Sequence, residues 1–215
     1  MSLRFSARRT SPASHDFFDT AGAFALPQNS FRPSERASAA FDVRLRSVTH
    51  FMWDLPFREK SWLGGWQVAG IATLQSGQPF TVNSAVDVNR DGNLTDRLNT
   101  LAGLLRDADQ EDRRARLRLE PGVNPFQLLA SDGGYGAVGR NTFRAAGVAN
   151  FDLAITKTFR FSDEGRASFR AEIFNLFNRP HFGIPVRILE APSFGHSVNS
   201  AIPARVVTLS VKLSL

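Results

Sequence analysis

The sequence predicts an all-β fold in which about six antiparallel strands form part of a transmembrane barrel with long loops at one end. The segment 148–177 gives the strongest evidence, because apolar and polar residues alternate along it in two consecutive stretches. Successive side chains of a strand point to opposite faces, so each stretch has one apolar and one charged face. Both stretches exceed the usual five or six residues, and they fit the roughly 9–11 residues that a tilted strand needs to cross a bilayer.

The spacing of the strands gives the second observation. We expect strands at 2–10, 41–55 and 66–80, in the two halves of 148–177, and at 205–215. The connections alternate between long and short: the long ones are 11–40, 78–147 and 178–204, and the short ones are 56–65 and 162–165. Outer-membrane barrels have long extracellular loops and short periplasmic turns, so the alternation predicts such a barrel, with its C-terminus on the periplasmic side.

Composition gives the third observation. The chain has 19 Phe but one Tyr and three Trp, a set suited to a lipid-facing surface with sparse aromatic girdles. No run approaches the roughly 18 apolar residues of a membrane helix, but alternation dilutes hydropathy in a barrel. The absence of Cys excludes disulfides and thiolate chemistry. The net charge of +6 is scattered along the chain, which argues against a nucleic-acid partner.

Two local expectations concern secondary structure and charge pairing. The segment 101–119 is rich in charge and has a thin apolar stripe, which suggests a surface helix. Asp152 and Glu172 are expected on one interior face, where cross-strand pairing with Arg170 or Arg160 explains them. We find no nucleophile motif, phosphate loop or distinctive carboxylate pair, so we expect that the protein is not an enzyme.

One segment resembles a metal-binding loop. Oxygen-bearing side chains recur with the spacing of a calcium loop and surround the turn-permitting Gly92. The candidate ligands are Asp87, Asn89, Asp91, Asn93 and Asp96. The bidentate Glu at the twelfth position of an EF-hand is missing, since Leu98 stands there, and Asp96 is the candidate substitute. The alternative is an exposed Asx- and Gly-rich turn without metal. Calcium is the cofactor that this sequence suggests.

The histidines suggest no site. His15, His50, His181 and His196 have no ligand spacing among them. His50 belongs to the polar face of its strand, where we expect it to face a lumen or a girdle.

Several strings together resemble a known family. They are Phe41-Asp42-Val43-Arg44, Trp53-Asp54-Leu55-Pro56-Phe57, Gly65-Trp66-Gln67-Val68-Ala69-Gly70-Ile71, Gln75-Ser76-Gly77-Gln78-Pro79-Phe80-Thr81, Gly139-Arg140-Asn141-Thr142-Phe143-Arg144 and Arg170-Ala171-Glu172-Ile173-Phe174-Asn175-Leu176-Phe177-Asn178. In this order they resemble the barrel of TonB-dependent outer-membrane receptors. The nearest group is Oar-like and carries an N-terminal carboxypeptidase-regulatory-like domain.

The resemblance implies energised substrate uptake through a barrel of about 22 strands with a plug domain inside it. This chain would then be the C-terminal barrel portion (1–215), located in the outer membrane. Its expected partners are outer-membrane lipid, the missing N-terminal barrel strands and the plug, with the TonB complex reached only through that plug. The start of the chain shows no secretory signal, which suggests a fragment. The family usually ends in an aromatic residue, whereas Leu215 ends this chain.

A second interpretation remains open from the residues alone. A soluble extracellular β-sandwich for adhesion or carbohydrate binding would also have alternating strands, and it would use the Asp87–Asp96 loop to bind calcium. A third interpretation, an autonomous small porin, requires at least eight strands, more than the six expected here.

Overall fold

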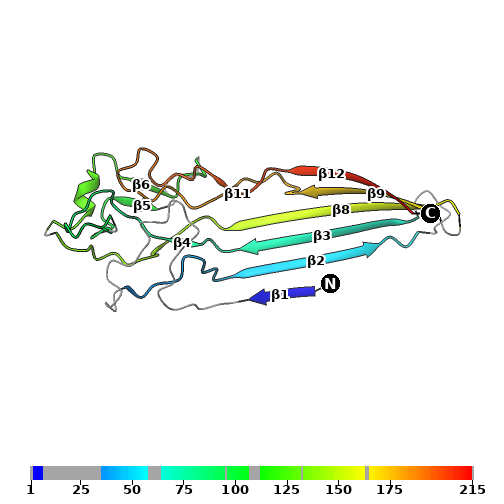
Figure 1. Cartoon of the computed structure of the whole chain (residues 1–215), viewed down its shortest axis with the longest axis horizontal. Coiled ribbons are helices and arrows are strands. Elements are labelled where there is room, and N and C mark those ends of the chain that lie inside the picture. The colour runs from blue at the N-terminus through cyan, green and yellow to red at the C-terminus, as the bar shows by residue number, and fades with distance from the viewer. Residues whose placement is uncertain are drawn as a thin grey trace.

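The structure is a computed structural model of the whole chain that describes residues 2–6, 35–57, 64–94, 96–106, 112–131, 133–162 and 165–214. A long six-stranded antiparallel sheet extends from a compact loop region at one end (Figure 1). Its strands, in spatial order, are β1 (Ser2–Ser6), β2 (Arg46–Asp54), β3 (Trp66–Gln75), β8 (Val148–Arg160), β9 (Arg166–Phe174) and β12 (Val206–Ser214). The predicted all-β fold class and the six predicted strands are confirmed.

One face of this sheet is apolar because the pairing runs without a shift across the strands. Val68 lies opposite Ile155, Ile155 lies opposite Ala171, and Ala171 lies opposite Leu209. Residues in register on neighbouring strands share a face. That face carries Phe51, Trp53, Trp66, Val68, Ala72, Leu74, Phe151, Leu153, Ile155, Phe159, Phe169, Ala171, Ile173, Val207, Leu209, Val211 and Leu213. Its side chains remain open to the surroundings: Leu209 is 77% exposed.

The opposite face is mainly polar, although Met52, Ile71 and Phe174 also lie on it. It carries Arg46, His50, Asp54, Gln67, Thr73, Gln75, Asn150, Asp152, Thr156, Thr158, Arg160, Arg166, Ser168, Arg170, Glu172, Thr208, Ser210 and Lys212. His50, Asp152 and Glu172 therefore lie on the face where the sequence placed them. Arg170 binds Glu172 along its own strand, with Nη2 2.7 Å from Oε1, instead of pairing across the hairpin.

The apolar face contains one lysine, Lys157, which is buried by its neighbours. Its ammonium donates a hydrogen bond to the carbonyl oxygen of Gly64. The nitrogen also lies 5.3 Å from the ring centroid of Trp66 and 4.9 Å from that of Phe159. Cation–π attraction and the carbonyl stabilise a charge that the surrounding apolar surface would not solvate.

The largest differences from the predicted strand ends lie in β2 and β3. β2 begins at Arg46 instead of Phe41, and β3 ends at Gln75 instead of Phe80. The chain leaves the sheet at Gly77, where an added Cβ would meet the carbonyl oxygen of Ala145 at 1.8 Å, so only glycine permits this approach. Beyond the bend, the short strands β4 (Pro79–Phe80) and β7 (Phe143–Arg144) pair with each other as a separate ribbon.

β9 ends at Phe174 because the next residue is left-handed. Asn175 has a φ of 51° and Asn178 a φ of 47°. The Asn175 side chain accepts from the N–H of Arg179 at 3.0 Å and donates to the carbonyl of Pro203 at 3.1 Å. Asn178 accepts from the N–H of Arg205 at 3.0 Å. These bonds join the start of the last long connection to its end; we call them the Asn175–Asn178 clip.

The helix predicted within 101–119 is wrong for the residues described there. β5 (Leu104–Arg106) and β6 (Leu117–Leu119) form an antiparallel pair, and residues 107–111 lie outside the described part. Leu104 and Leu117 are buried in the apolar core of the loop region. Leu117 and Leu119 alternate with the polar Arg118, which suits a strand better than a helix with a thin apolar stripe. The remaining small elements are η3 (Pro125–Leu128), β10 (His181–Phe182) and β11 (Ser200–Ile202).

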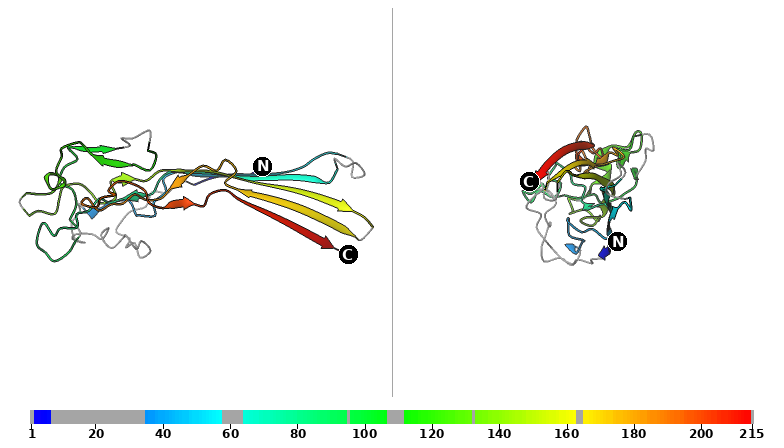
Figure 2. Two further views of the ribbon diagram at one scale, coloured as in Figure 1. Left: turned by 90° about the horizontal axis from the view of Figure 1, so that it is seen from above. Right: turned by 90° about the vertical axis from the view of Figure 1, so that its right-hand side faces the viewer.

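The sheet is curved and open. Figure 2 shows it bending away from the loop region, and the pairing order begins at β1 and ends at β12 without joining them. Among the described residues, the other sheets are two-stranded ribbons in the loop region, and none pairs with or covers the six-stranded sheet. The β-sandwich interpretation is therefore wrong, because a sandwich needs a second sheet on the apolar face.

An added positive charge should change the stability differently on the two faces of the sheet. Ile155→Arg places a guanidinium on the apolar face of the central strand β8, where we expect a loss of about 2–4 kcal/mol if that face meets hydrocarbon. Ala154→Arg places it on the polar face, opposite Glu172, and should be near neutral. The free energy of unfolding in lipid vesicles measures both. Equal losses for the two variants would contradict the assignment of the faces.

Candidate functional site

The long connections fold together into one body, which we call the loop module: the described parts of 35–45, 76–147 and 175–205. Its core is formed by Phe80, Val82, Leu98, Leu104, Leu117, Leu128, Leu129, Phe143, Ala145, Leu189 and Phe194. Phe80 and Phe143 stack across the β4–β7 ribbon with centroids 5.6 Å apart. The last connection contributes Leu189 and Phe194, so loops distant in sequence share one apolar interior.

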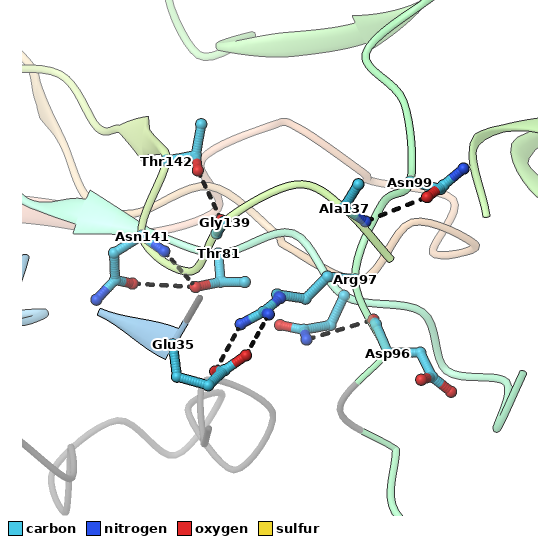
Figure 3. A network of polar contacts seen from close by, with 10 residues as sticks. Glu35, Thr81, Asp96, Arg97, Asn99, Ala137, Gly139, Asn141 and Thr142 are labelled. Carbon is cyan, nitrogen blue, oxygen red and sulfur yellow. Dashed lines mark hydrogen bonds and ion pairs between the residues drawn. The ribbon is translucent and has the colours of Figure 1, made fainter. Parts of the chain in front are cut away.

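A buried ion pair attaches the first connection to the second (Figure 3). The Arg97 guanidinium donates to both oxygens of Glu35, at 2.9 and 2.5 Å. The two side chains are only 4% and 6% exposed. A bidentate pair of this geometry compensates much of the cost of removing both charges from water. Glu35 thus fixes the chain ahead of β2 against the middle of the module.

Further polar bonds connect the same segments. Thr81 donates to the side chain of Asn141 at 3.0 Å, and Asn141 donates to the carbonyl of Ser38 at 2.7 Å. Arg144 binds the carboxylate of Asp42 at 2.7 Å and the carbonyl of Gly77 at 2.9 Å. The strings around residues 42, 77 and 141 that resembled a family therefore meet in space.

The last connection is held by Glu190. Its carboxylate accepts from the hydroxyl of Ser84 at 2.6 Å and from the N–H of Ala85 at 2.8 Å. The backbone of Asn83 also bonds that of Arg187 and Leu189. Residues 83–85 thus join the second long connection to the third.

The predicted calcium loop lies beside this junction. Asp87 accepts from the N–H groups of Asp91 and Gly92, at 3.1 and 2.9 Å, and Asn89 accepts from the N–H of Asp91 at 3.0 Å. Asp91 in turn accepts from the N–H of Asn93 at 2.9 Å. Arg90 and Gly92 are left-handed, with φ of 58° and 85°. Four of the five predicted ligands therefore lie in one tight turn.

Asp96, the fifth, is buried below that turn and is 1% exposed. Its Oδ2 accepts from the N–H of Val88 at 2.6 Å. Burial raises the pKa of Asp96, the charges of Asp87 and Asp91 add to the rise, and the N–H groups of Val88 and Asn89 oppose it. Among the described residues, no three His, Cys, Asp or Glu side chains are placed so that they could together hold a metal ion, and the calcium loop stays a prediction.

The histidines take different positions. His15 lies outside the described residues. His196 lies near Asp112, with Nε2 3.8 Å from Oδ2, in an open groove of roughly 680 Å³ that Arg114 and Phe182 also line. His181 is buried at the start of β10, and burial lowers its pKa, with the charges of Arg179 and Arg113 acting in the same direction.

A second groove lies on the polar face of the sheet, at the end opposite the loop module. It has a volume of roughly 420 Å³, and its lining includes Asp54, Gln67, Thr156, Thr158, Arg160 and Arg166. Gln67 donates to Asp54 at 2.7 Å. Such a surface suits water or a polar partner.

The comparisons with known proteins decide the family. Residues 5–208 match the family model described as outer membrane beta barrel domain. The chain belongs to this family. No curated protein and no solved structure matches the chain. No helix in the described part of the chain has the length and apolar character needed to span a membrane.

Membership of this family orients the molecule. The protein is located in the outer membrane. Because long loops of such barrels are extracellular, the loop module lies outside the cell and the short turns lie in the periplasm. Barrels of this kind present an apolar band to lipid and a polar interior, which are the characters of the two faces of this sheet. Lys157, Trp66 and Phe159 then lie near the periplasmic boundary, where aromatic girdles occur. The predicted periplasmic position of the chain's C-terminal end agrees with β12, which runs away from the loop module (Figure 1).

Removing the charge of one partner in the Glu35–Arg97 pair should greatly reduce the stability of the protein. Glu35→Gln leaves a buried guanidinium without its counter-charge, which costs about 3–5 kcal/mol. We expect faster hydrogen exchange in 35–42 and 81–98 and an unchanged rate in β8. The double variant Glu35→Leu with Arg97→Met removes both charges and should lose less stability than Glu35→Gln. A double variant that loses as much as the single one would show that the charge pairing is unimportant.

His181 predicts acid sensitivity of the loop module. Its folded pKa is lowered, so the unfolded state binds the proton first as the pH falls. Stability is therefore complete above the ordinary value of about 6.5 and declines below it, towards the lowered folded pKa. Hydrogen exchange around β10 and β11 at pH 7.5 and 5.5 measures this decline. His181→Gln should reduce the dependence, and a His181→Gln profile identical to wild type would assign the effect to other groups.

Proposed function

We propose that this chain is the C-terminal barrel portion of a TonB-dependent, Oar-like receptor that takes up a substrate across the outer membrane. Support comes from the curved sheet, whose outer face is apolar, whose inner face is polar, and which is capped by a folded extracellular module. A channel-forming wall requires the first two features, and substrate capture from outside requires the third.

The observation that carries the proposal is the pair of open edges. Within the described ranges, β1 and β12 each have one neighbour, and unpaired backbone groups in hydrocarbon cost several kcal/mol each. The six strands of the described sheet are also fewer than the eight of the smallest barrels. Additional strands must therefore pair with both edges. In the proposed receptor these are the N-terminal barrel strands, and the lumen holds a plug that contacts the TonB complex.

The same proposal defines the remaining partners. Outer-membrane lipid covers the apolar face, and the substrate contacts the loop module, where the groove at His196 is open to the outside. The protein acts by binding and transport, without catalysis of its own, and it has no nucleic-acid partner. A carboxypeptidase-regulatory-like domain would precede the plug.

Photo-crosslinking in native outer membranes tests the open edges. A photoreactive residue at Ser210, on the outer edge of β12, should form a crosslink to a strand outside the sheet described here. The same residue at Thr156, on the interior strand β8, is the matched control and should crosslink within the sheet. Membrane-embedded protein that forms no crosslink from Ser210 to another strand would contradict the incomplete barrel.

Energised uptake has its own test. Cells with and without the gene are compared for depletion of compounds from the medium, each with and without a protonophore. TonB-dependent uptake predicts a compound whose depletion requires both the gene and the proton gradient. Depletion that requires the gene but continues with the protonophore indicates a passive pore, and it would contradict this function while leaving the barrel intact.

A further inference from the structure

The loop Asp87–Asp96 contains a buried carboxylate oxygen that lacks a donor. Asp96 is 1% exposed, and among the described residues its Oδ1 makes no hydrogen bond, whereas Oδ2 accepts from Val88. A buried polar atom without a partner is costly, and a buried carboxylate is more so. The carboxylate faces the loop, because the N–H groups of Val88 and Asn89 both act on it, the first at Oδ2.

Other oxygen ligands surround the same turn. Asp87, Asn89 and Asp91 each accept a hydrogen bond from an N–H group of the turn. The two carboxylates have about four acceptor positions each and the Asn89 amide oxygen has two, so all three keep positions for a cation. The far side of the turn, from Arg90 to Leu94, is exposed. The turn is thus accessible to an ion from solvent, whereas Asp96 is buried beneath it.

We propose that this loop binds one calcium ion, with Asp96 as the inner ligand and Asp87, Asn89 and Asp91 as the outer ligands. The set consists only of oxygen, with three carboxylates, which selects a hard divalent cation. An irregular, adaptable arrangement favours calcium over magnesium, which demands a near-ideal octahedron. The ion draws the three carboxylates together from positions in which they are not yet a formed centre.

The position of the site gives the ion a structural consequence. Asp96 precedes Arg97, which holds Glu35, and the loop begins three residues after Ser84, which binds Glu190. Calcium therefore stabilises the point at which the three long connections meet. We expect the extracellular module to be more rigid in calcium than in a chelator.

Calcium titration of the full protein in detergent, after removal of metal with EDTA, tests this proposal. We expect one ion per chain, with a Kd on the order of 10⁻⁴–10⁻³ M as in extracellular modules. Hydrogen exchange of 81–98 should slow with calcium, and magnesium at equal concentration should act at least about tenfold more weakly. Equal effects of the two ions would overturn the assignment to calcium.

Two variants separate ligation from folding. Asp96→Asn keeps an oxygen for the Val88 N–H, and Asp91→Asn changes only the exposed turn; each should weaken calcium binding about tenfold or more while the calcium-free exchange rates of β8 and the module core stay unchanged. Asp112→Asn, in the same module but outside the loop, is the control. Wild-type affinity in both loop variants, or no binding at 10 mM calcium, would overturn the proposal. These measurements need no uptake, so their failure leaves the receptor function untouched.

Discussion

Backbone hydrogen bonding in a medium without water is the constraint on which this structure depends. In hydrocarbon each N–H and C=O needs a protein partner, so the strands pair in one unbroken register from β1 to β12. A fixed register also fixes which side chains share a face, since a slip of one residue would exchange the faces. The apolar outside and polar inside therefore follow from the pairing.

The loop module solves a different problem with different interactions. Its segments are long, polar and surrounded by water, so burial of a small apolar core competes with the loss of chain entropy. Directional bonds at Glu35, Asp42 and Glu190 select one arrangement of the connections. Arg97 and Arg144 supply bidentate or multiple bonds that a lysine would not match. The three connections are thereby held together in one folded module.

The sequence predicted the sheet well because alternation is a local signal. Each predicted strand overlaps a strand of the structure, and the largest errors lie at Phe41 and Phe80, where the alternation continues past the point at which the chain bends out of the sheet. Local patterns do not reveal such a bend, because it depends on Gly77 meeting Ala145, far along the chain. The predicted helix is wrong for a related reason. Leu104 pairs with Leu119, which lies much later in the chain, so the pairing is not visible in the local pattern.

The candidate site was predicted less completely. The spacing from Asp87 to Asp91 indicated a turn with oxygen ligands, and the structure has that turn. The burial of Asp96 was not visible, because it arises only when the chain folds back onto Asn83, Ser84 and Val88. The Glu35–Arg97 pair was also missed: a single Glu in a polar stretch gives no signal of a partner 62 positions away.

The Asn175–Asn178 clip has a consequence for how this protein can vary. Because Asn175 reaches Pro203 and Asn178 reaches Arg205, the chain leaves β9 and returns to β12 at one closed neck. Residues of this loop outside the shared core can therefore change in number or kind while the ends of β9 and β12 stay fixed. Leu189, Glu190 and Phe194 are the exceptions, because the other connections pack against them or bond to them. The closed neck thus confines variation to the outer surface of the last loop.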